Sequence, residues 1–222
     1  MKKYLIVLFL LIILLGVTGC KSNKYALEFK EEYESINGTT NNSGKVHRTI
    51  IIPKDNPFHK VEQKEIVKMI EEGKTFYLYV GDPLCPWCRS VLEKSIEVAK
   101  KKGVKEIYYI DIWDDNGNEI LRDKYELKDG SLEKTVEGTE EYKKLLKYFD
   151  SVLTKYTLTD SDGNKVDTGE KRIYAPNFFY VEKGKVIRLV EGISDKQKDS
   201  REELTKEMLD DEQKIFEDFF DN

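Results

Sequence analysis

Two cysteines separated by two residues are the strongest chemical feature of the sequence. Cys85 and Cys88 enclose Pro86 and Trp87, and this spacing at the first turn of a helix brings the two sulfurs close enough to bond. The free N–H groups and partial positive charge of a helix N-terminus favour a thiolate at Cys85. A lowered pKa makes Cys85 both an attacking sulfur and a good leaving group, and Cys88, one turn deeper, can resolve a mixed disulfide.

The two residues between the cysteines suit this interpretation. Pro86 fits the first helical turn, where its missing N–H would have had no partner. Trp87 provides an apolar surface beside the reactive sulfur. We therefore expect Pro86 and Trp87 to contact a substrate.

Other uses of a spaced cysteine pair compete with redox chemistry. A structural zinc site needs four ligands, usually from paired motifs, and the sequence has three cysteines and two histidines without a second such motif. A c-type haem needs histidine after the second cysteine, where Arg89 stands. A permanent structural disulfide is the main competitor in an oxidising compartment. The position between a strand and a helix favours a redox-active pair that needs no metal and no other cofactor.

The residues around the pair predict a βαβ unit. Apolar positions predict a helix from Val61 that ends at Gly73, and residues 75–80 are aromatic and β-branched, as in a buried strand. After a turn at 81–84, the helix that begins at the cysteines presents one apolar face and ends at Gly103. Residues 106–112 predict a second buried strand, so the pair lies at a strand-to-helix junction.

The second half of the chain predicts helices and hairpins. Residues 142–153 have the spacing of an amphipathic helix, as do residues 204–220. Residues 160–164 resemble a calcium loop, but glycine and glutamate are not at the required positions, so they predict a hairpin turn without calcium. Residues 177–182 and 185–190 predict two strands joined by a turn at Gly184.

The first twenty residues predict that the protein is exported from the cytoplasm. A short basic stretch precedes an unbroken apolar run at residues 5–15, which reaches about 16 Å, roughly half a bilayer core, as in a signal peptide. Val17, Thr18, Gly19 and Cys20 resemble the lipobox of bacterial lipoproteins, with cleavage after residue 19 and acylation of Cys20. The alternative is an ordinary cleaved signal with a coincidental cysteine. The expected location is the outer face of a bacterial membrane, held by lipid.

Residues 20–60 predict a linker and a small strand extension. A turn-rich stretch at 38–44 separates residues 25–36 from residues 46–52, and the second flank is β-branched enough for a strand. The two flanks predict either an appended hairpin or a spacer from the membrane. We interpret His47 and His59, which lie in this region, as surface residues.

With these motifs in order, residues 61–112 and 172–220 resemble a thioredoxin-fold protein. Cys85 to Cys88 match the family's active-site motif, Ala175 and Pro176 followed by residues 177–181 match its cis-proline segment, and Gly184 and Gly192 match later glycines. The resemblance implies that Pro176 is cis and faces the cysteines, with the Ala175 backbone available to a substrate strand. Thioredoxins proper carry Gly-Pro between the two cysteines and a buried aspartate on the preceding strand. In this chain the two residues are Pro86 and Trp87, and Tyr79 occupies the position of the aspartate. It is closer to extracytoplasmic thioredoxin-like lipoproteins, including bacteriocin transport accessory proteins.

The resemblance also implies an architecture. The expected class is α/β, with a central mixed sheet flanked by helices, an N-terminal extension and a helical insertion. The expected divisions are a signal peptide at 1–19, the linker at 20–60, and a thioredoxin-like domain at 61–222 whose insertion occupies about 114–171.

Composition narrows the functions that fit. A mean hydropathy of -0.58 argues against a polytopic membrane protein, and a net charge of -5 makes nucleic acid an unsuitable partner.

The leading hypothesis is a lipid-anchored thiol–disulfide oxidoreductase whose clients are secreted or surface proteins, with a membrane redox partner that resets the pair. The second is a redox-inert binding module, such as an accessory lipoprotein for an export system. The third, a solute-binding lipoprotein, is favoured only by the anchor.

Overall fold

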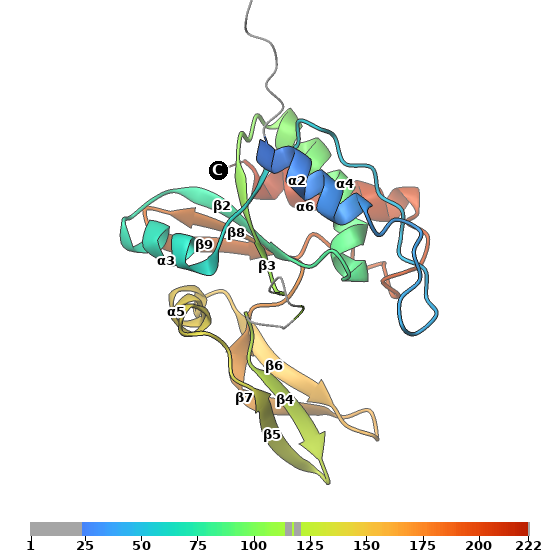
Figure 1. Ribbon diagram of the computed structural model, residues 1–222, viewed down its shortest axis with the longest axis vertical. Helices are drawn as coiled ribbons and strands as arrows, with labels where there is room; N and C mark the ends of the chain where they lie inside the picture. Colours follow the sequence, from blue (N-terminus) through green and yellow to red (C-terminus); the bar gives the residue numbers. More distant parts are fainter. Residues whose placement is uncertain (1–23, 114–116, 118–120, 222) are drawn as a thin grey trace, which may run out of the picture.

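The computed structural model describes residues 24–113, 117 and 121–221 (Figure 1). The predicted signal peptide at 1–19 and the predicted acylation site at Cys20 lie outside the described residues. In chain order, the elements are α2 (Lys24–Glu34), β1 (Phe58–Lys60), α3 (Gln63–Glu71), β2 (Phe76–Gly81), α4 (Pro86–Lys101), β3 (Ile107–Asp111), β4 (Lys124–Lys128), β5 (Ser131–Val136), α5 (Glu140–Phe149), β6 (Thr154–Thr159), β7 (Lys165–Arg172), β8 (Asn177–Glu182), β9 (Lys185–Val190) and α6 (Lys206–Phe219).

The molecule is a mixed α/β protein built on a five-stranded sheet. The strand order is β1-β3-β2-β8-β9, in which β1, β3 and β2 run parallel and β8 and β9 are antiparallel to their neighbours. The predicted βαβ unit is confirmed as β2-α4-β3, and the predicted hairpin is confirmed as β8-β9. The parallel strands bring the carboxyl ends of β2 and β3 to one edge, from which the chain leads into α4.

Each face of the sheet carries its own helical layer. On β2, Tyr79 packs with α2, α4 and α6, whereas Phe76, Leu78 and Val80 pack with α3 and α5. This alternation follows from the two-residue period of a strand, which sends successive side chains to opposite faces. Figure 1 shows the same layers, with α2, α4 and α6 on one side of the sheet and α3 and α5 on the other.

The prediction for residues 20–60 is wrong in its secondary structure. Residues 24–34 form helix α2, because Ala26, Phe29 and Tyr33 repeat at helical spacing and their side chains are fully buried in the core. Residues 46–52 form no strand beyond an isolated bridge between Thr40 and Val46. The strand of this region is instead β1, which extends the central sheet beside β3.

The interpretation of the two histidines as surface residues needs correction. The His47 side chain is buried, with 6% of its surface exposed, because the connection from α2 to β1 folds back over the body of the protein. The His59 ring is partly covered, since it stacks on Tyr25 at a centroid distance of 3.6 Å and its Nδ1 lies 2.8 Å from Glu106.

The predicted helical insertion at 114–171 is mainly β-structure in its described part. Only α5 is helical, and it packs against the sheet as the predicted amphipathic helix. The rest forms two hairpins, β4-β5 and β6-β7, which lie away from the central sheet in Figure 1 and meet through the rings of Tyr125 and Tyr156. The predicted turn at 160–164 joins β6 to β7, and the Asp160 carboxylate accepts hydrogen bonds from backbone N–H groups of that turn.

Candidate active site

The two cysteines lie where β2 leads into α4. β2 ends at Gly81, residues 82–84 form a turn, and Cys85 is the N-cap of α4 with Pro86 in the first helical turn. The turn is held by Asp82, whose carboxylate accepts a hydrogen bond from the Leu84 N–H at 2.7 Å. The Cys85 sulfur in turn accepts a hydrogen bond from the Cys88 N–H at 3.4 Å. A sulfur thus occupies the capping position that a serine or aspartate oxygen usually fills.

Cys85 contacts the segment that was expected to face it. The Cys85 thiol donates a hydrogen bond to the Ala175 carbonyl oxygen at a sulfur-to-oxygen distance of 3.4 Å. The Ala175–Pro176 peptide bond is cis. Residues ninety positions apart in the sequence therefore meet at the reactive sulfur, immediately before β8 begins.

The environments of the two thiols differ in a way that assigns them different chemistry. Both are free thiols; Cys85 is partly exposed and Cys88 is fully buried. A hydrogen bond from the Cys88 thiol, assisted by backbone N–H groups, lowers the pKa of Cys85. Burial raises the pKa of Cys88 well above its usual range, and the Cys85 thiolate adds to that increase. Cys85 is thus the thiol that ionises first.

The other predicted site residues surround Cys85. Pro86 and Trp87 are both partly exposed, and the Trp87 carbonyl accepts a hydrogen bond from the Ser90 hydroxyl at 2.8 Å. Leu84, which sequence reasoning did not assign to the site, is half-exposed on the turn before Cys85. Apolar surface therefore lies next to the partly exposed sulfur.

Three buried tyrosines pack with Cys88 in one core cluster, and of these Tyr33 was not expected from the sequence. Tyr79 lowers the pKa of the Cys88 thiol against the larger effect of burial, and the Tyr79 hydroxyl oxygen lies 3.1 Å from that of Tyr33. The Tyr109 ring stacks on Tyr79 at a centroid distance of 5.5 Å. On β2, the alternation of Tyr79 with Leu78 and Val80 could have indicated that the Tyr79 side chain points to the opposite face of the sheet. The position of Tyr33 could not be inferred without recognising helix α2.

The buried guanidinium of Arg89 is the second unexpected feature. It is fully buried immediately after Cys88, and all its hydrogen-bond acceptors are uncharged oxygens. Nε and Nη2 donate to the Arg48 carbonyl, Nη1 donates to the Tyr33 and Pro83 carbonyls, and Nη2 also donates to the Asn37 side chain. Arg89 therefore ties α2, the following connection and the turn before Cys85 to α4.

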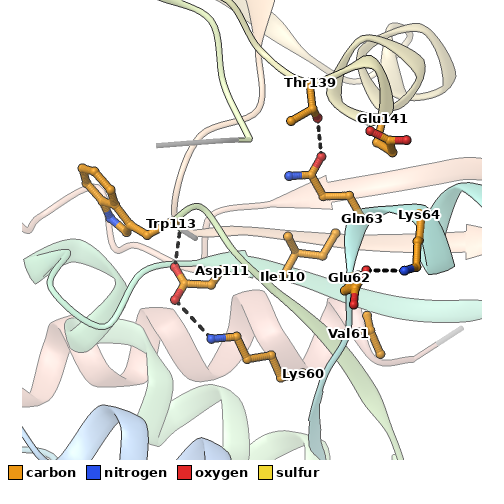
Figure 2. A pocket seen from close by; sticks show the side chains of 10 residues that line it. All are labelled: Lys60, Val61, Glu62, Gln63, Lys64, Ile110, Asp111, Trp113, Thr139 and Glu141. Atoms are coloured by element: carbon orange, nitrogen blue, oxygen red, sulfur yellow. Dashed lines mark hydrogen bonds and ion pairs between the residues drawn. The ribbon is translucent and has the colours of Figure 1, made fainter. Parts of the chain in front are cut away.

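A cleft of about 440 Å³ opens at the carboxyl ends of β1 and β3, but the cysteines are not among its lining residues. Figure 2 shows its polar groups bonded to one another: Lys60 reaches Asp111 at 3.4 Å, and the Thr139 hydroxyl donates to Gln63 at 2.6 Å. The Trp113 backbone N–H also donates to Asp111, whereas the buried Trp113 indole N–H has no hydrogen-bond partner among the described residues. Most polar groups of the cleft are therefore already paired with one another.

The arrangement can support nucleophilic thiol chemistry at Cys85. Among the residues that the structure describes, no group of three or more histidine, cysteine, aspartate or glutamate side chains gathers where it could hold a metal ion. Within the same residues, no helix is long and apolar enough to cross a membrane. No family model matches the chain, and no curated protein matches it. A function for the chain must therefore be inferred from the geometry of the two cysteines.

Limited alkylation should label Cys85 before Cys88. Because Cys85 is the partly exposed thiol with the lowered pKa, it holds more thiolate at neutral pH, and its labelling should slow as the pH falls through that pKa. The measurement is peptide mass mapping after brief iodoacetamide treatment, with a Cys20→Ser background so that only Cys85 and Cys88 can react. Labelling of Cys88 first would contradict the assignment.

Proposed function

We propose that the chain is a lipid-anchored extracytoplasmic thiol–disulfide oxidoreductase with a thioredoxin-like fold. The fold assignment is supported by the parallel β1, β3 and β2, the antiparallel β8 and β9, and the helices on both faces of the sheet. It is also supported by a cysteine pair at the start of α4 and a cis proline immediately before β8. In this proposal, α2 and the two hairpins β4-β5 and β6-β7 are additions to the common fold.

One observation carries the proposed activity: Cys85 is partly exposed with a lowered pKa, and its sulfur accepts a hydrogen bond from the backbone of the buried Cys88. The Cys85 thiolate attacks one sulfur of a client disulfide, and the other client sulfur leaves as a thiolate. Cys88 then attacks Cys85, which releases the client and closes a Cys85–Cys88 disulfide. Two electrons pass from the pair to the client, and no cofactor other than the pair is required.

The surroundings of Cys85 support a protein as the client. The Ala175 backbone lies beside the sulfur, where an extended client segment could pair with it, and Trp87 and Leu84 provide adjoining apolar surface. Clients in this proposal are secreted or surface proteins, because Cys20 carries the lipid that holds the chain on the outer face of the membrane. A membrane redox partner returns the pair to its starting state.

The test is a redox titration followed by client turnover. The Cys20→Ser chain, equilibrated in glutathione buffers, should convert between a dithiol and a Cys85–Cys88 disulfide with a single midpoint, measured by alkylation and mass. It should also accelerate disulfide exchange in a model protein that contains a reducible disulfide. A redox-inert binding scaffold would give a turnover rate equal to that of buffer alone, and that result would overturn the proposal.

A further inference from the structure

Helix α2 lies beside α4, the helix that begins at the cysteines, and runs in the opposite direction (Figure 1). Near the start of α4, Arg89 donates a hydrogen bond from Nη1 to the Tyr33 carbonyl at 2.8 Å. Tyr33 precedes the last residue of α2, Glu34. The end of α2 is therefore at the cysteine end of α4, and the start of α2 is at the other end of the pair.

Residues 55–57 join the start of α2 to the last turn of α4. The Asn56 side-chain amide donates to the Ala26 carbonyl at 2.8 Å, and the preceding Asp55 pairs with Lys100 at 2.6 Å. At 1.5 Å per residue, Lys100 lies about 22 Å from Cys85 along the axis of α4. The first turn of α2, residues 54–57 and residues 100–105 thus form one end of the molecule, which we call the amino-end face.

The proposed lipid anchor is close to this face in the sequence. Only residues 21–23 separate Cys20 from Lys24, the first residue of α2. A chain extends by at most about 3.6 Å per residue, so the Lys24 Cα atom can lie no more than about 14 Å from that of an acylated Cys20. Two faces adjoin the start of α2 and could rest on the bilayer: the amino-end face and the outer side of α2.

The charges on these two faces differ. Four of the six residues 100–105 are lysines, in a chain whose net charge is -5. The outer side of α2 instead exposes Glu28 and Glu31. An anionic phospholipid surface attracts lysine side chains and repels carboxylates, so it favours the amino-end face over the side of α2.

The lysines of the amino-end face orient the molecule rather than bind it alone. Three of them pair with carboxylates, namely Lys100 with Asp55, Lys101 with Glu217 and Lys102 with Asp221, and these pairs reduce the local excess of positive charge. The lipid therefore supplies most of the attachment.

An exposed aromatic ring at the same end also suits a lipid surface. Tyr25, the second residue of α2, is 42% exposed, and its ring stacks on His59 at a centroid distance of 3.6 Å. Tyrosine is enriched at the boundary between lipid and water, because its ring is apolar and its hydroxyl is polar. Tyr25 is therefore placed to meet the headgroups that the short connection to Cys20 brings near.

We propose that the amino-end face rests on an anionic phospholipid surface, so that the cysteines face the aqueous side about 22 Å farther from the bilayer. This orientation rests on the lipid anchor of the proposed function and specifies how its partners must approach. Clients reach Cys85 as soluble or exposed segments, and the redox partner that resets the pair presents its reactive group above the membrane surface rather than within it.

The experiment measures which face of the acylated full-length chain meets lipid. On a Cys85→Ser/Cys88→Ser background, a bimane fluorophore is attached through Asp55→Cys in the amino-end face, Ser35→Cys at the far end of α2, or Leu84→Cys beside the site; all three native side chains are exposed. The chains are reconstituted into phosphatidylglycerol–phosphatidylcholine vesicles that contain a lipid with a nitroxide on its headgroup, which quenches nearby fluorophores. The probe at 55 should lose most of its fluorescence, and the probes at 35 and 84 should keep theirs. Quenching at 35 or 84 as strong as at 55 would overturn the inference.

Lysine variants test the part played by charge. Lys100→Gln/Lys101→Gln/Lys105→Gln should weaken quenching of the probe at 55 and strengthen it at 35. The matched control makes the same change in net charge at three exposed lysines of the hairpins, Lys124→Gln/Lys128→Gln/Lys165→Gln, and should leave the quenching at each probe unchanged. Identical quenching in the two triple variants would contradict the proposed orientation by lysine. If the chain does not float with the vesicles, the lipid anchor of the proposed function fails as well; a chain that floats with the wrong probe quenched overturns the orientation alone.

Discussion

Replacing Cys85 with serine should reduce disulfide exchange to the rate of buffer alone. The Cys85 pKa is lowered by hydrogen bonds from the Cys88 thiol and from backbone N–H groups at the start of α4. A serine hydroxyl in the same place would remain protonated and would not attack a disulfide, so we expect a loss of at least about a thousandfold. The measurement is the initial rate of exchange with a model disulfide protein, on the Cys20→Ser background.

Cys88→Ser is the matched variant, because it removes the second sulfur from the same motif. It should retain the first attack by Cys85 and accumulate a mixed disulfide with the client, since the buried position no longer holds a nucleophile. Mass mapping should place this mixed disulfide on Cys85. An unimpaired Cys85→Ser enzyme, or trapping on Cys88 in Cys85→Ser, would contradict the order of attack derived from the structure.

The parts of the site that could be predicted from the sequence are those with local signals. Two cysteines at helical spacing after an aromatic and β-branched segment predicted the junction of β2 and α4. Two apolar runs around Gly184 predicted β8 and β9 with their observed bounds. The contact of Cys85 with Ala175 joins distant residues, and it was expected only through the resemblance to a known family.

The missed features depend on contacts that no local pattern records. The apolar positions of α2 are few among many charged residues, so its buried face was not recognised and neither was the place of Tyr33 beside Tyr79. No residue of β4 or β5 is buried. β4 alternates polar and apolar residues over only five positions and β5 does not alternate, so neither was recognised as a strand.

Arg89 is the missed residue with the largest expected effect on stability. Arginine is rarely fully buried, so nothing in the sequence marked Arg89 as a core residue. Its acceptors come from residues 33, 37, 48 and 83, which converge only when α2 and the following connection fold over α4. No spacing in the sequence indicates such a set.

Replacing Arg89 with methionine should lower the free energy of unfolding by about 3–5 kcal/mol. The long apolar side chain keeps much of the volume, but the Tyr33, Arg48 and Pro83 carbonyls lose the donors that the guanidinium supplied. Each buried acceptor left without a donor costs about 1–3 kcal/mol. The measurement is urea unfolding of reduced wild type and variant, followed by circular dichroism.

Arg188→Met is the control, because Arg188 is a partly exposed arginine that pairs with Asp218 at the surface. Its loss should change the free energy of unfolding by no more than about 1 kcal/mol. Arg89→Lys tests the geometry separately: it keeps the charge, but one ammonium group cannot span acceptors on α2, the connection and the turn before Cys85 as a planar guanidinium does. We therefore expect lysine to recover less than half of the lost stability. Full recovery by lysine would show that charge alone, rather than the shared set of carbonyl acceptors, holds these segments against α4.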